Sequence, residues 1–295
     1  MNIETMHETK THGTLAFPYA VYKGNIPEYI KSFPLHWHDE LEIIYVERGR
    51  GTVTAGSKRY DVKEHDMIVV LPQTIHSIEQ YKSESMEYYN ILFDFSLLTY
   101  STNDVCYEKY FKPLYNHTKQ PPPFMESGSK HNAALLKNVK YLIENRKNAA
   151  NDELMIRSNL FELMHKLNEM SAATSSSELS LKNNYDKLKN LLVYVRSHYD
   201  REISIAEAAE ICWFSPSHFM KLFKDMTGKG FTQYLIDYRL EIAAARLASS
   251  RDKIIDIAQA VGFNNTSYFS RAFFDKYGAT PSAYRAAAHA AKHSD

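Results

Sequence analysis

The sequence predicts an α+β protein of two domains, a strand-rich barrel or sandwich followed by an all-α domain. Three observations support this prediction. The chain of 295 residues is longer than one core usually needs. The spacing of apolar residues changes from strand-like to helical along the chain, and one helical pattern occurs twice near the carboxyl end. The hydrophobic fraction of 44% and the charged fraction of 24% are ordinary for a globular protein.

The first domain is expected over residues 1–170. Between residues 15 and 95, short segments rich in Val, Ile, Tyr and Phe alternate with Gly, Pro and Asp, as in LEIIYVERG and DMIVVLP. Many short strands at close spacing are typical of barrels and sandwiches. After the proline-rich KQPPPF, apolar residues follow a helical period over residues 131–170, with examples at Leu154, Leu160, Leu163, Met164 and Leu167. The helices expected there pack on each other, on the strands or on a second subunit.

The polar segment SAATSSSELS predicts a flexible linker over residues 171–183. Residues 184–288 are expected to form the helical domain, and the tail 289–295 is expected to fray. From Ser180 to the end, the chain carries 16 Lys and Arg against 12 Asp and Glu. This small basic excess is compatible with a nucleic-acid partner and equally with a solvated surface.

The two cysteines, Cys106 and Cys212, are far apart and follow neither a disulfide nor a zinc pattern. The amino terminus has no apolar stretch of signal-peptide length, and the longest apolar run, MIVVL, is too short to span a bilayer. We therefore expect a cytoplasmic protein with no membrane partner.

The repeated pattern reads PSHFMKLFKDMTG and, fifty residues later, TSYFSRAFFDKYG. A single offset without a gap aligns Ile205 with Ile255, Ala208 with Ala258, Phe219 with Phe269 and Gly228 with Gly278. Each copy predicts a short helix, a turn and a second helix. In the first copy Ser215 and Pro216 mark the start of the second helix, because serine is a good N-cap and proline suits the first helical position. The duplication indicates one structural unit used twice.

Each second helix is expected to bury one apolar stripe and to expose the opposite face. The exposed residues are predicted to be Ser217, Met220, Lys221 and Lys224 in the first copy and Ser267, Ser270, Arg271 and Phe274 in the second. Two short helices joined by a tight turn can insert the second helix into a major groove. One copy would suit the solvated surface of a helical bundle equally well, whereas two copies favour DNA. The segment between them predicts a helix of about 27 Å, comparable with the spacing of about 34 Å between successive major grooves.

Residues 184–285 resemble the DNA-binding domain of AraC/XylS-type bacterial transcription regulators. The motifs that carry the resemblance are FSPSHFMKLFKDMTGKGFTQYLIDYRLEIAAARL and DIAQAVGFNNTSYFSRAFFDKYGATPSAYR, and the second is close to the signature of that family. The resemblance implies DNA base contacts from Ser217, Met220, Lys221, Thr266, Ser267, Ser270 and Arg271, and phosphate contacts from Ser215 and Lys224.

Two residues depart from the pattern of that family. Phe274 stands where the family usually has lysine, so the second helix either loses a phosphate contact or places a ring against a thymine methyl group. Met220 is apolar where a hydrogen-bonding residue is often found, so the first helix is expected to discriminate bases weakly.

The stretch HWHDELEIIYVERG places His36, His38 and Glu42 at even spacing, and His76 follows LPQTI. Alternate residues of a strand share a face, so these side chains are expected to converge inside the barrel. Three imidazoles and a carboxylate suit a divalent transition metal. The stretch also resembles the first cupin motif, and PQTIH a shortened second one. Similar stretches occur in AraC-type regulators with cupin-like sensing domains, which implies either a small-molecule pocket or support for the barrel.

We therefore expect an effector pocket formed by His36, His38, Glu42, His76, Trp37 and Tyr45. No cofactor is required, and a divalent metal on His36, His38, Glu42 and His76 is the open alternative. Tyr19, Tyr22, Trp37 and Tyr45 suit stacking on sugar rings, which makes a carbohydrate one candidate effector, although most aromatics in a small barrel form its core.

The function expected from these features is sequence-specific DNA binding by a transcription regulator, an activator, that responds to a small-molecule effector through a cupin-like sensing domain and is not an enzyme. Its expected partners are double-stranded DNA, the effector, RNA polymerase and a second copy of the chain, with residues 131–170 as the dimerising or relaying segment. The rival hypothesis is a cupin metalloenzyme, a dioxygenase or isomerase, with an appended DNA-binding domain. A third hypothesis is a regulator without a ligand.

Overall fold

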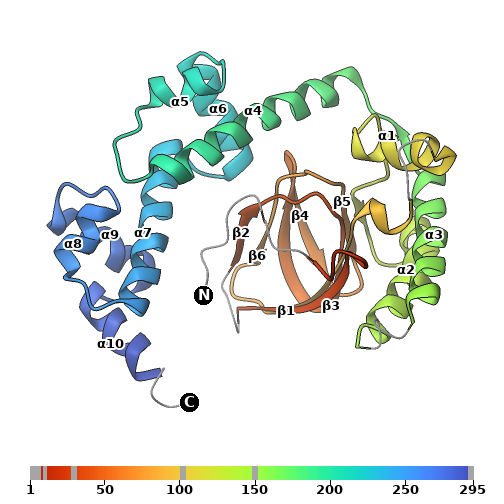
Figure 1. Ribbon diagram of the computed structural model, residues 1–295, viewed down its shortest axis with the longest axis horizontal. Helices are drawn as coiled ribbons and strands as arrows, with labels where there is room; N and C mark the ends of the chain where they lie inside the picture. The colour runs from red at the N-terminus through yellow and green to blue at the C-terminus, as the bar shows by residue number, and fades with distance from the viewer. Residues whose placement is uncertain (1–7, 9–11, 28–31, 100–103, 148–151, 292–295) are drawn as a thin grey trace. The chain divides into compact units, whose positions relative to one another are not determined.

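The computed structural model describes residues 8, 12–27, 32–99, 104–147 and 152–291, and it divides into two compact units after Asn183. Strands dominate the first unit and helices the second, so the predicted fold class is confirmed (Figure 1). Across the described ranges, no helix is both long and apolar enough to cross a membrane.

The first unit is built on antiparallel strands that share one long strand, β3. The strands are β1 Tyr19–Ile26, β2 Ser32–His36, β3 Leu41–Ala55, β4 Lys58–Lys63, β5 Met67–Val70, β6 His76–Gln80, β7 Met86–Phe93 and β9 Phe124–Met125. The first half of β3 pairs with β5 and β7, and its second half pairs with β4 and β6. Gly49 lies where the partners change, with a φ of 78°, and a Cβ there would overlap the carbonyl oxygen of Ser85. Glycine thus allows β3 to change from its pairing with β5 and β7 to its pairing with β4 and β6.

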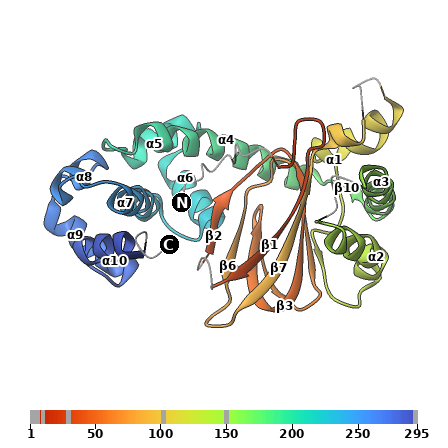
Figure 2. The ribbon, with the colours of Figure 1, turned by 60° about the horizontal axis from the view of Figure 1, so that its bottom comes forward.

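The two faces of β3 have different neighbours. Ile44, Val46 and Val53 point into the interior between the sheets, where they pack with residues of β5, β6 and β7. Ile43 and Tyr45 point to the opposite face, which packs on the predicted helical segment. That segment forms α2 Lys130–Glu144 and α3 Glu153–Glu169, which lie beside the strands (Figure 2). A barrel interior on one side and a helix-covered face on the other follow from the strand period of two.

One detail of the predicted helical stripe is wrong. Leu154 is 84% exposed, and the buried stripe of α3 starts at Ile156 and continues through Leu160, Leu163 and Leu167. Leu154 is the second residue of α3 and lies about 160° around the helix from Ile156, at about 100° per residue, so it faces away from the sheet.

The flexible linker predicted over residues 171–183 is also wrong. Strand β10, Ala172–Ala173, pairs with β8, Lys119–Gln120, and α4 extends from Ser176 to His198. Before the helix, Ser175 Oγ accepts a hydrogen bond from the backbone of Glu178, whose carboxylate accepts one from the backbone of Ser175. This reciprocal capping box explains why a serine-rich segment begins a helix.

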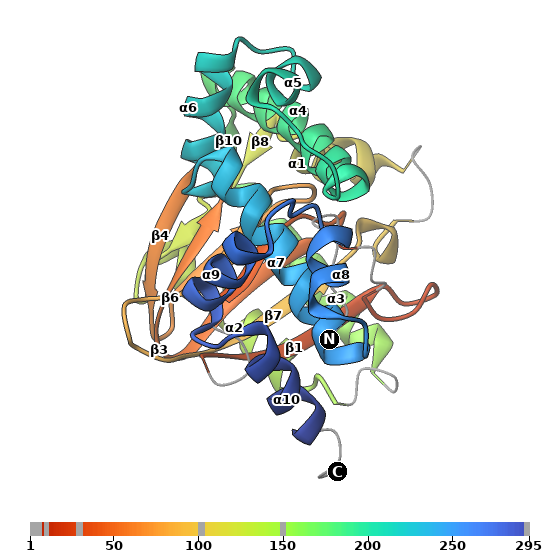
Figure 3. The same cartoon turned by 90° about the vertical axis from the view of Figure 1, so that its left-hand side faces the viewer.

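Short elements complete the first unit: η1 Phe95–Leu97, the π-helical turn η2 Tyr107–Phe111 and α1 Lys112–Tyr115. The second unit contains α5 Ile205–Ile211, α6 Pro216–Thr227, α7 Phe231–Ser249, α8 Ile254–Ala260, α9 Thr266–Tyr277 and α10 Pro281–Ala291. Helix α7 runs between the pair α5–α6 and the pair α8–α9 (Figure 3). The predicted fraying tail begins inside α10, and residues 292–295 lie outside the described residues.

Candidate functional site

The pairs α5–α6 and α8–α9 are two copies of one structure, but the offset between them changes at the turn. Helices α6 and α9 start at Pro216 and Thr266, fifty residues apart, whereas α5 and α8 start at Ile205 and Ile254, forty-nine apart. The ungapped alignment at fifty is therefore wrong for the first helices, and the second turn contains one extra residue.

Helices α6 and α9 are delimited by equivalent residues. At the start, Ser215 Oγ accepts from the backbone of His218 at 3.4 Å, and Asn265 Oδ1 accepts from the backbone of Tyr268 at 2.9 Å. At the end, Gly228 and Gly278 adopt the left-handed conformation, with φ of 74° and 68°. Side-chain caps and C-terminal glycines thus fix both helices at the same length.

The inward faces of α6 and α9 are aromatic, and the outward faces are free for contact. Phe219, Phe223, Phe269 and Phe273 are fully buried. The predicted contact residues lie on the other side: Ser215, Ser217, Met220, Lys221, Lys224, Ser267 and Arg271 are exposed, and Thr266 and Ser270 are half-buried. Within the described part of the chain, Lys221, Lys224 and Arg271 take part in no ion pair, so their charges are available to an anionic partner. Their individual contacts remain predictions.

Helix α7 and the segment before α5 fix the two pairs in one unit. Arg239 of α7 donates to the carbonyl oxygens of Tyr199 and Arg201, each at 2.7 Å. Lys276 of α9 donates to Glu241 of α7 at 2.7 Å. With 19 residues, α7 is about 28 Å long, close to the length predicted for the spacer.

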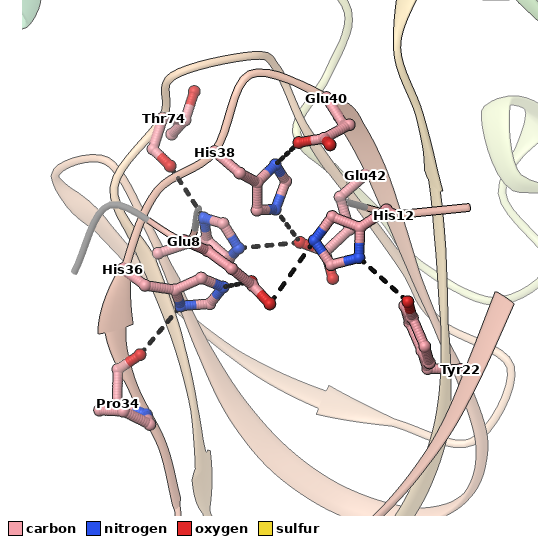
Figure 4. A network of polar contacts seen from close by, with 10 residues as sticks. Glu8, His12, Tyr22, Pro34, His36, His38, Glu40, Glu42 and Thr74 are labelled. Atoms are coloured by element: carbon pink, nitrogen blue, oxygen red, sulfur yellow. Dashed lines mark hydrogen bonds and ion pairs between the residues drawn. The ribbon is translucent and has the colours of Figure 1, made fainter. Parts of the chain in front are cut away.

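The histidine cluster forms in the first unit where β2, β3 and β6 meet. The structure brings together His36, His38, Glu42 and His76, all of them buried, and one ligand atom from each lies within 4.8 Å of the others. Glu42 Oε2 lies 3.1 Å from His38 Nε2 and 2.8 Å from His76 Nε2 (Figure 4). The carboxylate of Glu42 is thus the centre of the cluster.

Backbone carbonyls orient two of the imidazoles. His36 Nδ1 lies 2.9 Å from the carbonyl oxygen of Pro34, and His76 Nδ1 lies 2.8 Å from that of Thr74. A carbonyl oxygen only accepts, so each Nδ1 carries the proton and donates, and each Nε2 faces the cluster. In the neutral ring, Nε2 of His76 then presents a lone pair to the Glu42 carboxylate. The lone pair of Nε2 and the negatively charged carboxylate oxygen repel each other. A proton or a cation between Nε2 of His76 and Oε2 of Glu42 removes this repulsion.

The charges in the cluster are strongly coupled. Burial would raise the pKa of Glu42, but the imidazoles of His76 and His38 outweigh burial and hold that pKa well below its usual range. Burial opposes a charge on His38, but the carboxylates of Glu40 and Glu42 outweigh it and raise the pKa of His38 to about 10. Burial, with His76 nearby, lowers the pKa of His36 well below its ordinary value. In the cluster, the carboxylate of Glu42 is therefore ionised, the imidazole of His38 is charged and that of His36 is neutral.

Sequence reasoning missed three members of this network. Glu8 lies 3.5 Å from His12 Nε2 and 3.7 Å from His36 Nε2, and His12 Nδ1 lies 3.2 Å from the hydroxyl of Tyr22. Glu40 contacts His38 Nδ1 at 3.3 Å. Glu40 stands two residues from His38 and Glu42 and could have been included by proximity. Glu8 and His12 belong to no strand pattern, so no sequence signal pointed to them.

The placement of Tyr45 in the effector pocket is wrong. Its hydroxyl lies 2.8 Å from His65 Nδ1, and its ring packs with the helix-facing side of the sheet. Tyr45 stands three positions after Glu42, an odd offset along the strand, so the two side chains point to opposite faces of β3. Tyr19 lies on the same helix-facing side. Trp37, which stands between His36 and His38 in the sequence, is buried, and its role in a pocket remains a prediction.

The residues of the cluster fit a divalent transition metal. Imidazole and carboxylate are suitable ligands, and backbone hydrogen bonds fix the rings as they do around bound metals. Nε2 of His76 is buried and makes no hydrogen bond within the described residues, although it lies close to Glu42. An ion held by His36, His38, Glu42 and His76 would satisfy that atom and compensate the buried carboxylate.

The comparisons with known proteins agree with both halves of the chain. A family model for a helix-turn-helix domain matches residues 208–287, and one for an AraC-like ligand binding domain matches residues 29–164. The chain is 24% identical over 288 residues to the uncharacterized HTH-type transcriptional regulator YdeC of Bacillus subtilis, a match that covers 96% of each protein. It is 26% identical over 254 residues to the MmsAB operon regulatory protein of Pseudomonas aeruginosa, covering 84% of this chain and 76% of that protein.

Among solved structures, the DNA-binding domain of AdpA in complex with a target DNA matches 37% of this chain and 98% of its own, with 25% identity and a TM-score of 0.36. The two family models lie on the strand-rich and the helical unit respectively. The chain belongs to the AraC type of transcriptional regulators, with a ligand-binding domain followed by a DNA-binding domain.

Proposed function

We propose that this regulator recognises its operator with α6 and α9 together, in two successive major grooves on one face of the duplex. The observation that carries the proposal is the pair of exposed polar helix faces in one unit, with α7 between them. The spacer helix α7, about 28 Å long, suits major grooves spaced by about 34 Å, because the widths of the pairs α5–α6 and α8–α9 add to the distance between α6 and α9. Base contacts then come from Ser217, Met220, Lys221, Thr266, Ser267, Ser270 and Arg271, and phosphate contacts from Ser215 and Lys224.

Selection of bound fragments from random DNA by the full chain tests this proposal. We expect a bipartite consensus whose two halves have centres about 10 base pairs apart. A matched control is the chain with Arg271→Ala and Lys221→Ala together, which should lose the consensus while keeping its melting temperature. Recovery of no consensus by the unaltered chain would refute the proposal.

We also propose that the sensing domain holds a divalent transition metal on His36, His38, Glu42 and His76, as part of its response to an effector. The ligand atoms lie within 4.8 Å of one another, a spacing that suits an ion at their centre. Such an ion would supply positive charge beside the buried Glu42 and link three strands. The same cluster keeps the metalloenzyme hypothesis open as the alternative.

Elemental analysis of the full chain, purified without added metal, tests the metal site. We expect one equivalent of a transition metal, lost in His38→Ala and kept in the control His165→Ala, whose side chain is exposed on α3. Absence of metal, or equal content in both variants, would refute the site. If metal is bound but its removal leaves operator affinity and effector response unchanged, the enzyme hypothesis is favoured over sensing.

Dimerisation through α3 is a further part of the proposal. Leu154 and Phe161, seven residues apart on one face of that helix, are 84% and 43% exposed, as expected for a surface that a second copy covers. In sedimentation experiments, Leu154→Lys with Phe161→Lys should convert a dimer to a monomer, whereas Val105→Lys, at another exposed apolar residue, should not. A dimer that persists in the double variant would exclude this surface.

The remaining expectations stay predictions. They are a cytoplasmic location, activation through RNA polymerase, and a carbohydrate as the effector. The first is consistent with a DNA partner and with the free cysteines Cys106 and Cys212.

A further inference from the structure

Helices α6 and α9 each carry an exposed large apolar side chain on the polar face that is assigned to DNA, whereas the exposed Tyr268 of α9 lies about 120° around the helix from Phe274. Met220 of α6 is 44% exposed, and Phe274 of α9 is 51% exposed. Neither belongs to the buried set of its helix, which in α6 is Phe219, Leu222, Phe223 and Met226 and in α9 is Phe269 and Phe273. Packing within the domain therefore does not account for an apolar residue at either position.

The helical period places Phe274 in the middle of the face assigned to DNA. At about 100° per residue, it lies about 20° from Ser267, 40° from Ser270 and 60° from Arg271. It lies well away from the buried rings of Phe269 and Phe273, which face the rest of the domain. Met220 lies at the edge of the corresponding face of α6, about 40° from Lys224.

In a major groove, these side chains have one apolar group to contact. Base edges there present hydrogen-bond donors and acceptors, and only thymine adds a methyl group. A phenyl ring forms no hydrogen bond with a phosphate, and a thioether is a weak acceptor. Contact with any other base edge would desolvate a polar group without replacing its hydrogen bonds.

We propose that Met220 and Phe274 each read the methyl group of a thymine, so that the operator carries one thymine under α6 and one under α9. This inference rests on the proposed insertion of both helices into major grooves. Phe274 follows Arg271 by three residues, a rise of about 4.5 Å along the helix, against about 3.4 Å per base pair. The thymine under α9 lies one or two base pairs from the base that Arg271 contacts.

Single replacement of thymine by deoxyuridine in the selected operator tests this inference, because it removes the methyl group and leaves base pairing intact. With the full chain, one replacement under each helix should weaken binding about four-fold, the ratio that corresponds to burial of one methylene-sized group. Replacements elsewhere in the duplex should change affinity by less than about two-fold.

Variants drawn from the other copy show which residue reads which thymine. Phe274→Lys introduces the residue that α6 carries at this position, Lys224, and should abolish the deoxyuridine effect under α9 only. Met220→Ser introduces the residue found in α9, Ser270, and should abolish the effect under α6 only. Phe274→Leu should preserve sensitivity. Ile255→Ala, at an exposed apolar residue of α8, should preserve both effects.

The outcomes distinguish a failure of methyl recognition from a failure of the proposed insertion of α6 and α9 into major grooves. If the chain selects no sequence, insertion of the helices into grooves is itself wrong. If it selects a sequence but no deoxyuridine replacement weakens binding, or if the effects persist in Phe274→Lys and Met220→Ser, methyl recognition is overturned. Melting temperatures of the variants should match that of the unaltered chain, since both residues are exposed.

Discussion

The two helix pairs of the DNA-binding domain share their inner faces and differ in their outer faces. Phe219 and Phe269 occupy equivalent, fully buried positions, whereas Lys224 corresponds to Phe274 on the outside. Packing fixes the residue type inside, because a change of volume there leaves a cavity or a clash. On the exposed faces, only contact with the DNA partner constrains the residue type. Helices α6 and α9, with equivalent buried faces and different exposed faces, suit an operator whose two halves differ in sequence.

The turns show the same division between shared backbone and different surroundings. Trp213 and Gly262 occupy equivalent positions, both with positive φ, at 57° and 88°. Trp213 is 85% exposed. A Cβ at Gly262 would lie 2.8 Å from the carbonyl oxygen of Tyr199 and 2.9 Å from that of Asp200. The second turn is packed against the segment before α5, and the first is open.

If the inner faces are equivalent, the same truncation should have the same effect in both copies. Phe219→Ala and Phe269→Ala should each lower the free energy of unfolding by about 3 to 5 kcal/mol, because each removes a fully buried ring from an aromatic cluster. Chemical denaturation of the full chain, followed by helical circular dichroism, measures this. A loss below about 1 kcal/mol in one copy would show that its inner face is not core.

At the turns, the same comparison predicts unequal effects. Gly262→Ala should cost at least about 2 kcal/mol, from left-handed strain and from overlap with backbone oxygens. Trp213→Gly should change stability by less than about 1 kcal/mol, because relief of strain is offset by added freedom of the unfolded chain. Equal costs, measured by thermal unfolding, would contradict the difference in packing.

The outer faces should separate base recognition from phosphate binding. Arg271→Ala should weaken binding to the selected operator by about 1 to 3 kcal/mol and relax preference at one base pair. Lys224→Ala should weaken binding to all sequences alike and reduce the slope of affinity against salt by about one. Titrations against matched and scrambled duplexes at several salt concentrations distinguish the two. If Arg271→Ala affected every sequence equally, its assignment as a base reader would be wrong.

Local signals in the sequence were enough to predict much of the helical domain. Ser215 and Pro216 marked the start of α6, and the spacing of Phe219 and Phe223 gave its buried face. The register between copies could not be obtained in this way, because one inserted residue in a turn leaves the periodicity of each helix unchanged. The helix across the predicted linker depended on the pair Ser175 and Glu178, a local signal that the polar composition of the segment obscured.

The sensing domain was less predictable, because its cluster depends on contacts between distant segments. Even spacing did place His36, His38 and Glu42 on one side, and the same rule should have excluded Tyr45. Glu8 and His12 reach the cluster from outside any named strand, and no periodicity encodes such a contact.

Hydroxyl-radical footprinting of the full chain on its selected operator tests the central claim most directly. With α6 and α9 in successive grooves, two protected segments should appear on one face of the duplex, about 10 base pairs apart. Arg271→Ala should weaken only one of them. A single protected segment, or protection that Arg271→Ala reduces uniformly, would contradict two-groove recognition by one chain.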